Sequence, residues 1–261
     1  MPTFTVLNDI HLKPAYEGVV EAVTVPPETD AVIVAGDLLD RSDPESVEQG
    51  RRLLSRLDDS PVPTALVPGN HDPLATAEAL VEGFDSVVLA HERRVTAADV
   101  PGPAEAFDQV PVVGVGCEQF DAGVEVEYDA AAELTVRDEH GHVDRYEERE
   151  AVRRLLAGFD ALLSAETTPG NLGSEFGFPG TAIDGLRRAF DRGRVLTDLL
   201  SVDRPVLLAS HVPPFGTDLD VHHSAETRAD DGLHTGWLAL AGAIRQATPA
   251  VAVTGHSHVR G

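Results

Sequence analysis

Lysine is almost absent from this chain of 261 residues. Only Lys13 occurs, so the other 19 of the 20 cationic residues are arginines, against 44 aspartates and glutamates. The formal net charge is therefore −24. Such a balance argues against a broad basic surface that would bind the phosphates of nucleic acid at ordinary salt.

The scarcity of lysine also bears on the salt in which the protein works. An ordinary acidic protein keeps many lysines, whereas this composition resembles that of proteins from halophilic archaea. Multimolar salt shortens electrostatic screening to about 3 Å and removes the self-repulsion of so many acidic groups. We therefore expect a halophilic protein, with an ordinary acidic protein as the alternative. In a halophile the argument against nucleic acid weakens, because every protein there is acidic.

Cysteine and long apolar runs are scarce as well. Cys117 is the single cysteine, which excludes an internal disulfide and favours a reducing cytoplasm. No apolar run approaches the roughly 20 residues that a membrane span needs. The first residues, MPTFTVLNDIHL, lack the basic start and apolar stretch of a signal peptide. We expect a cytoplasmic protein without a membrane partner.

Short apolar runs bounded by turn residues recur along the chain and predict buried strands. They are Phe4–Leu7, Ala31–Ala35, Ala65–Val67, Ser86–Leu89, Val112–Val115, Val206–Ala209 and Val251–Val253. Helices are predicted over Pro44–Leu57, which begins with the capping pair Asp43-Pro44, and over Thr235–Gln246. This alternation predicts a layered α/β fold with strands buried on both faces.

Residues 118–200 break that alternation. We predict amphipathic helices over Tyr146–Leu163 and Thr181–Leu200, with a loop rich in Gly and Pro over Thr167–Gly180 between them. The chain is accordingly expected to be a single domain over residues 1–261, with residues 118–200 as a helical and charged insertion or cap.

Clusters of Asp, Asn and His follow five of the predicted strands. They are Asn8-Asp9-Ile10-His11, Gly36-Asp37-Leu38-Leu39-Asp40, Gly69-Asn70-His71-Asp72, Ser210-His211 and Gly255-His256-Ser257-His258. Open α/β sheets place their ligand sites at the carboxyl ends of strands. Five loops are therefore expected to converge on one crevice.

The residue types suit metal ions. Aspartate and histidine are common ligands of Zn, Mn, Fe and related divalent ions. An i, i+2 pair on an extended segment points both side chains to one side, as for Asp9 with His11 and for His256 with His258. A carboxylate such as Asp37 has two oxygens with which to bridge two ions, and ions about 3.5–4 Å apart can clamp a phosphate. Each cluster alone could be an ordinary turn, but their joint occurrence in this order favours a metal pair.

The ordered set D-x-H, G-D-x-x-D, G-N-H-D, H and G-H-x-H resembles the calcineurin-like metallophosphoesterases, over about residues 3–90 and 205–261. His211–Asp220 is similar to archaeal members. The resemblance implies a two-sheet α/β/β/α sandwich. It also implies hydrolysis of a phosphate mono- or diester by a hydroxide that bridges two divalent ions (Mn, Fe, Zn or Ni). Family members usually continue beyond the last motif, so we expect a short C-terminal end after His258.

The resemblance also assigns roles to the motif residues. Asp9, His11 and His258 would hold one metal, Asn70, His211 and His256 the other, and Asp37 both. His71 would be catalytic, stabilising the transition state or protonating the leaving oxygen. Asp72 would orient His71, with a helix N-cap as the alternative. Asp40 would steady the Asp37 loop, with an exposed turn as the alternative.

The expected partner is a small phosphoester substrate, and the sequence does not indicate an oligomeric state. One alternative is a DNA or RNA nuclease of the same superfamily, whose members are typically longer. Nucleic acid is accordingly not expected as a partner, although the sequence does not exclude it. The other alternative is a non-catalytic metal-binding scaffold, but degenerate members of that kind usually lose ligands that this chain retains.

Overall fold

The computed structural model describes residues 1–60, 62–116, 125–129, 133–137, 143–147, 151–178, 180–217, 219–222, 233–234 and 236–256. The chain divides into two compact units. Unit 1 comprises Met1–Glu118, Val202–His211 and Pro249–His256, and unit 2 comprises Gln119–Ser201, Val212–Thr248 and Ser257–Gly261. The expectation of a single domain with residues 118–200 as its cap stays a prediction.

The first sheet of unit 1 is parallel throughout. Its order is β1 (Phe4–Leu7), β2 (Ala31–Ala35), β3 (Thr64–Val67) and β4 (Val87–Leu89). Every residue of β2 and β3 is buried, as expected for central strands covered on both faces. All four strands were predicted from their apolar runs, with ends correct to within one residue.

The second sheet of unit 1 has the order β13 (Val251–Thr254), β10 (Leu207–Ser210), β6 (Val112–Val115) and β5 (Arg93–Val95). The first three strands are parallel, and β5 pairs with β6 in the antiparallel sense. A buried cluster containing Ile33 and Val67 of the first sheet and Val112 and Leu207 of the second joins the two sheets face to face. The predicted α/β class with two sheets is therefore confirmed.

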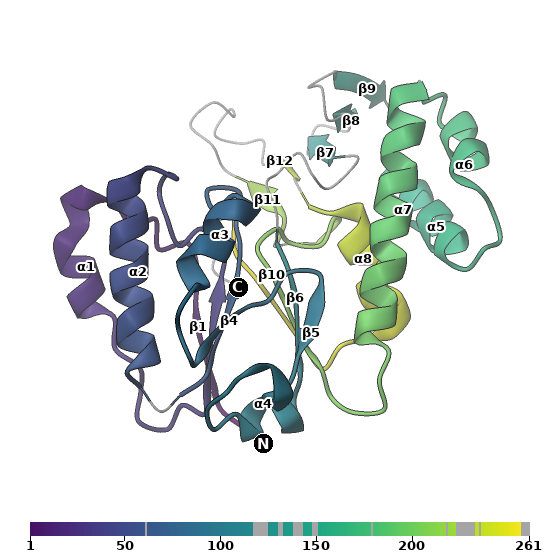
Figure 1. Ribbon diagram of the computed structural model, residues 1–261. Helices are drawn as coiled ribbons and strands as arrows, with labels where there is room; N and C mark the ends of the chain where they lie inside the picture. Colours follow the sequence, from purple (N-terminus) through teal and green to yellow (C-terminus); the bar gives the residue numbers. More distant parts are fainter. Residues whose placement is uncertain are drawn as a thin grey trace. The chain divides into compact units, whose positions relative to one another are not determined.

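The side-chain alternation of β2 divides its residues between two cores. Ala31, Ile33 and Ala35 face the second sheet, whereas Val32 and Val34 belong to a cluster with the helices. Those helices are α1 (Glu17–Ala22), α2 (Pro44–Asp58) and α3 (Leu74–Val81), which cover the outer face of the first sheet (Figure 1). Short elements complete unit 1, namely η1 (Pro14–Tyr16), η2 (Ala97–Asp99) and α4 (Glu105–Gln109).

Helix α2 begins where its capping pair predicts. The Asp43 carboxylate accepts hydrogen bonds from the backbone N–H groups of Glu45 and Ser46, and Pro44 occupies the first turn. Leu53, Leu54 and Leu57 line the buried face of the helix. Local capping and a 3.6-residue apolar period thus agree on this element.

Unit 2 contains four helices among its described residues, α5 (Ala151–Leu163), α6 (Pro169–Glu175), α7 (Gly180–Leu200) and α8 (Leu238–Ala247). They share a core that includes Phe159, Leu186, Phe215 and Leu238. An antiparallel sheet in the order β11 (Val221–His222), β12 (Leu233–His234), β7 (Glu125–Asp129), β8 (Glu133–Arg137) and β9 (Val143–Glu147) also belongs to this unit. None of the described helices combines the length and the apolarity that crossing a membrane requires.

Two predictions for unit 2 were wrong. The predicted helix Tyr146–Leu163 begins only at Ala151, because Val143–Glu147 pairs with β8 instead. The predicted loop Thr167–Gly180 contains helix α6, whose Thr168 hydroxyl accepts a hydrogen bond from Asn171 N–H while Pro169 starts the helix. Thr168-Pro169 is the same cap signal as Asp43-Pro44, and the surrounding glycines obscured it.

Candidate metal centre

The described residues of the five predicted clusters, which end at His256, lie in unit 1, where they follow the carboxyl ends of β1, β2, β3, β10 and β13. The backbone brings the loops together directly. Asp9 N–H donates to Gly36 O at 3.2 Å, and Gly255 N–H donates to His211 O at 2.9 Å. Residues up to 247 positions apart in the chain thereby meet, since His256 N–H also donates to Asp9 Oδ1 at 2.9 Å.

Three predicted ligand atoms form a tight triangle. Asn70 Oδ1 lies 2.9 Å from His211 Nε2 and 3.0 Å from His256 Nδ1, and the two nitrogens are 3.3 Å apart. Ligands placed about 2.0–2.1 Å from a single ion lie about 2.9 Å apart in octahedral geometry and about 3.3 Å apart in tetrahedral geometry. The triangle therefore has the spacing of donors in one coordination shell.

The Asp37 carboxylate is the common member of two ligand groups. Its Oδ2 lies 3.3 Å from His211 Nε2, 3.7 Å from His11 Nε2 and 3.9 Å from His71 Nε2. Among the described residues, His11, Asp37 and His71 form one group whose ligand atoms all lie within 4.8 Å of one another. Asp9, Asp37 and His211 form the other. Asp37 is thus shared by both groups of candidate ligands.

Four of the predicted ligands have a left-handed backbone. Asp9, His11, Asp37 and His256 have φ values of 50°, 49°, 47° and 68°. This conformation costs an L-residue with a side chain about 1–2 kcal/mol. Such strain persists where surrounding contacts over-determine it, and it gathers at functional sites. The strain at these four positions therefore supports their assignment as candidate functional residues.

Two glycines make room for these ligands. A Cβ on Gly69 would lie 2.1 Å from Asp37 Oδ1 and 2.2 Å from Asp37 N. A Cβ on Gly36 would lie 2.3 Å from His211 Nδ1, and the φ of Gly36 is +86°. Neither position can hold a side chain without displacing a ligand. The glycines that precede Asp37 and Asn70 in the sequence therefore have a steric cause.

Asp37 and His211 shift one another's proton affinity. Burial by itself would raise the pKa of Asp37, but the hydrogen bond to His211, the charge of His211 and the N–H of His71 outweigh it and lower the pKa. Burial by itself would lower the pKa of His211, but the hydrogen bond to Asp37 and the charges of Asp37 and Asp9 raise it. In the metal-free protein each of these two side chains therefore favours the charged form of the other.

The structure gives Asp72 a different partner from the predicted one. Its buried carboxylate accepts hydrogen bonds from the N–H groups of Leu38 and Leu39, both at 2.9 Å, and of Gly69 at 3.2 Å. Asp72 therefore holds the loop that carries Asp37, the role expected of Asp40. It does not cap helix α3 either, because Pro73 occupies that N-cap without a side-chain hydrogen bond.

The main chain of Asp40 takes the role expected of Asp72. His71 Nδ1 lies 2.6 Å from the carbonyl oxygen of Asp40. Because a carbonyl can only accept, Nδ1 must carry the proton, which leaves Nε2 on the side of Asp37. Ser42 Oγ also donates to His71 O at 3.2 Å. The two loops that bear Asp37 and His71 thus brace one another.

Nine of the ten predicted site residues lie among these contacts. His258 lies outside the described residues, so its role stays a prediction. His71, predicted to be catalytic rather than a ligand, stands within ligand distance of the Asp37 group, and 40% of its side-chain surface is exposed.

The sequence matches the family model described as calcineurin-like phosphoesterase over residues 2–260. The chain belongs to that family. Among solved structures, the crystal structure of TT1561 of Thermus thermophilus is similar, with a TM-score of 0.45 and 17% identity over 96% of this chain and 80% of that chain. No curated protein matches the sequence.

Membership of the calcineurin-like phosphoesterase family implies a metal-dependent hydrolysis of phosphoesters. The residues present fit divalent ions. The donors are carboxylate and amide oxygens with imidazole nitrogens, and the buried side chains of Asp37 and His211 lie 3.3 Å from one another. His211 Nδ1 contacts Ala35 O at 3.4 Å, which leaves its Nε2 for a metal.

Sequence reasoning missed one residue of this region. Lys13 Nζ lies 3.3 Å from Asp40 Oδ1, beside the loop that orients His71. The sequence did offer one signal for this residue, because Lys13 is the only lysine of the chain.

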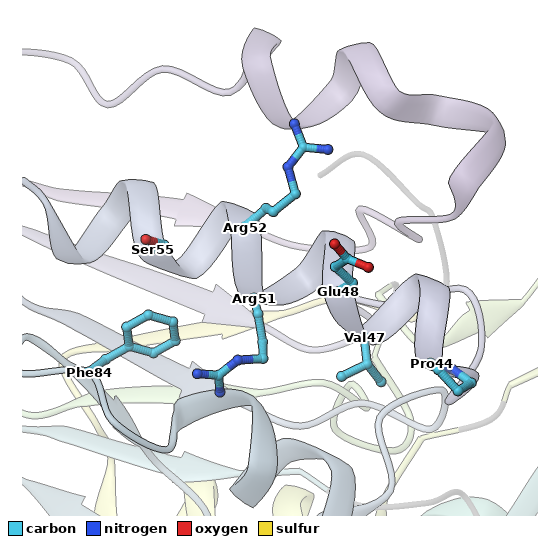
Figure 2. A pocket seen from close by; sticks show the side chains of 7 residues that line it. All are labelled: Pro44, Val47, Glu48, Arg51, Arg52, Ser55 and Phe84. Carbon is cyan, nitrogen blue, oxygen red and sulfur yellow. The ribbon is translucent and has the colours of Figure 1, made fainter.

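A surface hollow of about 510 Å³ beside α2 is a separate feature, and no predicted ligand lines it (Figure 2). Its lining consists of Pro44, Val47, Glu48, Arg51, Arg52, Ser55 and Phe84. Figure 2 shows Arg51 extending toward Phe84 while Arg52 points away from that ring. Arg51 Nη1 donates to Ala79 O and Leu80 O at 2.7 and 3.1 Å, which ties α2 to the end of α3. We therefore attribute the hollow to the packing of α2 against the end of α3 rather than to the candidate metal centre.

Proposed function

We propose that this phosphoesterase hydrolyses a phosphate mono- or diester with two divalent ions. The proposed ligands are Asp9, His11 and His258 for one ion, Asn70, His211 and His256 for the other, and Asp37 for both. The observation that carries the proposal is the position of Asp37, which belongs to both ligand groups. Two bound ions would ionise a water near neutral pH and polarise the phosphoryl oxygens.

The chain's own residues would position the reaction. Asp37, Asn70 and His211 come from three loops and hold their ligand atoms within a few ångströms of one another before any ion binds. That preorganisation reduces the reorganisation needed during the reaction.

His71 would serve the leaving group. Its Nδ1–H is held by Asp40 O, so the ring can present Nε2 to the substrate. When protonated, Nε2–H would give its proton to the leaving oxygen as the P–O bond breaks, while the oxygen of the attacking water forms the new P–O bond. The exposed part of the ring makes it accessible to a substrate.

The test is hydrolysis of bis-p-nitrophenyl phosphate and of p-nitrophenyl phosphate at high KCl with added Mn²⁺, Zn²⁺ or Ni²⁺. Asp37→Ala and Asn70→Ala are each expected to reduce kcat by about a thousandfold, because several kcal/mol of transition-state stabilisation is lost. Wild-type turnover in either variant would sink the proposal. Preferential cleavage of single-stranded DNA or RNA at the same salt would support the nuclease alternative.

We further propose that the protein works in a salt-rich cytoplasm, in keeping with a haloarchaeal origin. The support is compositional, namely 44 acidic against 20 basic residues and a single cysteine. Self-repulsion should unfold the protein when salt is removed. Thermal unfolding measured from low to multimolar KCl should give a Tm that rises throughout, and a Tm independent of salt would contradict this part.

A further inference from the structure

The one lysine of the chain, Lys13, lies beside Asp40, the residue whose carbonyl oxygen contacts His71. Every other cationic position, 19 in all, is an arginine, yet the residue two positions after His11 is Lys13. Its ammonium group lies 3.3 Å from Asp40 Oδ1. A lysine ammonium is a compact point charge, whereas an arginine guanidinium is a broad planar fork. The chain therefore places its single compact cation in contact with the Asp40 carboxylate.

The backbone holds Lys13 against this loop. Residues 11–13 run alongside residues 37–40, with His11 N–H donating to Asp37 O at 3.0 Å and Leu12 N–H donating to Leu38 O at 2.9 Å. Asp40 N–H returns a hydrogen bond to Leu12 O at 3.0 Å. Leu12 and Leu39 are fully buried at this bridge. The ion pair thus rests on a hydrogen-bonded, buried backbone segment rather than on a mobile surface loop.

Asp40 connects Lys13 to His71. Its carboxylate contacts Lys13 Nζ on one side, and Arg41 Nε lies 3.7 Å away on the other. Its carbonyl oxygen accepts a hydrogen bond from His71 Nδ1–H, with 2.6 Å between nitrogen and oxygen. The Arg41 side chain is 81% exposed, whereas those of Lys13 and Asp40 are 34% and 24% exposed. Lys13 is therefore the less exposed of the two cations and the closer to the Asp40 carboxylate.

We propose that Lys13 is a positioning residue that acts through Asp40 to fix the orientation and the tautomer of His71. With the Asp40 carboxylate anchored by Lys13, the carbonyl of the same residue stays aimed at His71 Nδ1. Without the lysine, the Asp40 side chain and the following turn gain freedom, and the His71 ring loses its fixed partner. The effect on catalysis rests on the proposed function of His71, but the effect on the tautomer does not.

The first experiment reads the tautomer directly. Metal-free protein labelled with ¹⁵N-histidine is examined by NMR at about pH 8.5, where an ordinary imidazole is neutral. The His71 signals are assigned by their loss in His71→Gln. Wild-type His71 is expected to be protonated at Nδ1. Lys13→Met should shift it toward the mixture of tautomers shown by free histidine, and Lys13→Arg should restore most of the wild-type signal.

The second experiment uses the leaving group. A p-nitrophenolate leaves without a proton, whereas an alkoxide needs one, so only the second reaction depends on a well-placed acid. Lys13→Met should lower kcat about tenfold for an ethyl phosphate ester. This is near the lower end of the loss of activity that follows when a residue supporting the site is removed. The same substitution should leave kcat for the matching p-nitrophenyl ester nearly unchanged. Arg52→Met removes a surface ion pair with Glu21 and serves as the matched control with no change in either substrate.

The outcomes separate the two proposals. An unchanged His71 tautomer in Lys13→Met overturns the inference. So does an equal loss of kcat for both esters, which indicates a structural defect, or a rise in KM alone, which indicates a direct contact with the substrate. If the wild-type protein hydrolyses neither ester, the proposed function fails while the NMR result still decides the role of Lys13.

Discussion

The two units use the left-handed backbone for different purposes. In unit 2 it occurs at Ala165 and Thr248, which end helices α5 and α8. There it is compensated locally, since Glu166 N–H donates to Ala161 O and Thr248 N–H donates to Ile244 O. In unit 1 it occurs at Glu92, at two glycines and at four predicted metal ligands, and none of these four ligands ends a helix. The same conformation thus lies at two helix ends in unit 2 and at predicted ligands that follow strands in unit 1.

The largest expected effect comes from removing the strain in each unit with glycine, which adopts positive φ freely. His256→Gly should reduce kcat by about a thousandfold through the loss of a ligand, while the metal-free protein keeps its Tm because the relieved strain offsets the lost contacts. Thr248→Gly should stabilise the protein by about 1 kcal/mol with unchanged kcat. Calorimetry and steady-state kinetics check both. A large loss of stability in His256→Gly with metal binding intact would contradict the comparison.

A smaller effect is expected from crowding a ligand without removing it. Gly69→Ala places a Cβ against Asp37 and should cost about a hundredfold in kcat, since a displacement near 1 Å has that effect. Gly102→Ala is the control, because nothing lies within 4 Å of its added Cβ. Kinetics and Mn²⁺ titration check the pair. Equal behaviour of the two variants would mean that the Asp37 loop adapts easily.

The next largest effect is expected from weakening the hydrogen bonds by which the Asp72 carboxylate holds the loop that carries Asp37. Asp72→Asn replaces one accepting oxygen by a donor, so at least one buried N–H among Leu38, Leu39 and Gly69 loses its partner. We expect a loss of about 2 kcal/mol in unfolding free energy. Asp43→Asn is the control, because asparagine caps a helix as well as aspartate does. Urea unfolding of both variants checks this, and equal midpoints would show that the brace is dispensable.

The smallest effect concerns pH. The raised pKa of His211 means that a proton must leave before Nε2 can bind a metal, so apparent Mn²⁺ affinity should rise with pH through that pKa. Without metal, the two pKa shifts make the stability of the protein depend on pH in opposite senses. The raised His211 pKa contributes stability that is lost as pH rises through it, and the lowered Asp37 pKa contributes stability that is lost as pH falls through it. Calorimetric titration from about pH 6 to about pH 8.5 should show proton release on binding. Absence of proton release would argue against His211 as a ligand.

Much of the fold was predictable because the local sequence patterns agree with the burial of the same residues in the tertiary structure. The strand Ala31–Ala35 is apolar throughout and is buried throughout. Helix α6 escaped prediction because its cap, Thr168-Pro169, stands among glycines that suggest a loop. The start of α5 was misplaced because Val143–Glu147 pairs with β8, a contact that sequence periodicity does not contain.

The sequence by itself determined which residues could hold metals and where they would gather, because the carboxyl ends of parallel strands lie at one edge of a sheet. Tertiary structure alone decided which atom of each residue is used. Asp72 serves the Asp37 loop through its carboxylate, whereas Asp40 serves His71 through its main chain and Lys13 through its side chain. These choices depend on backbone angles and on contacts between residues far apart in the chain. Residue type and spacing in the sequence specify neither these backbone angles nor these contacts.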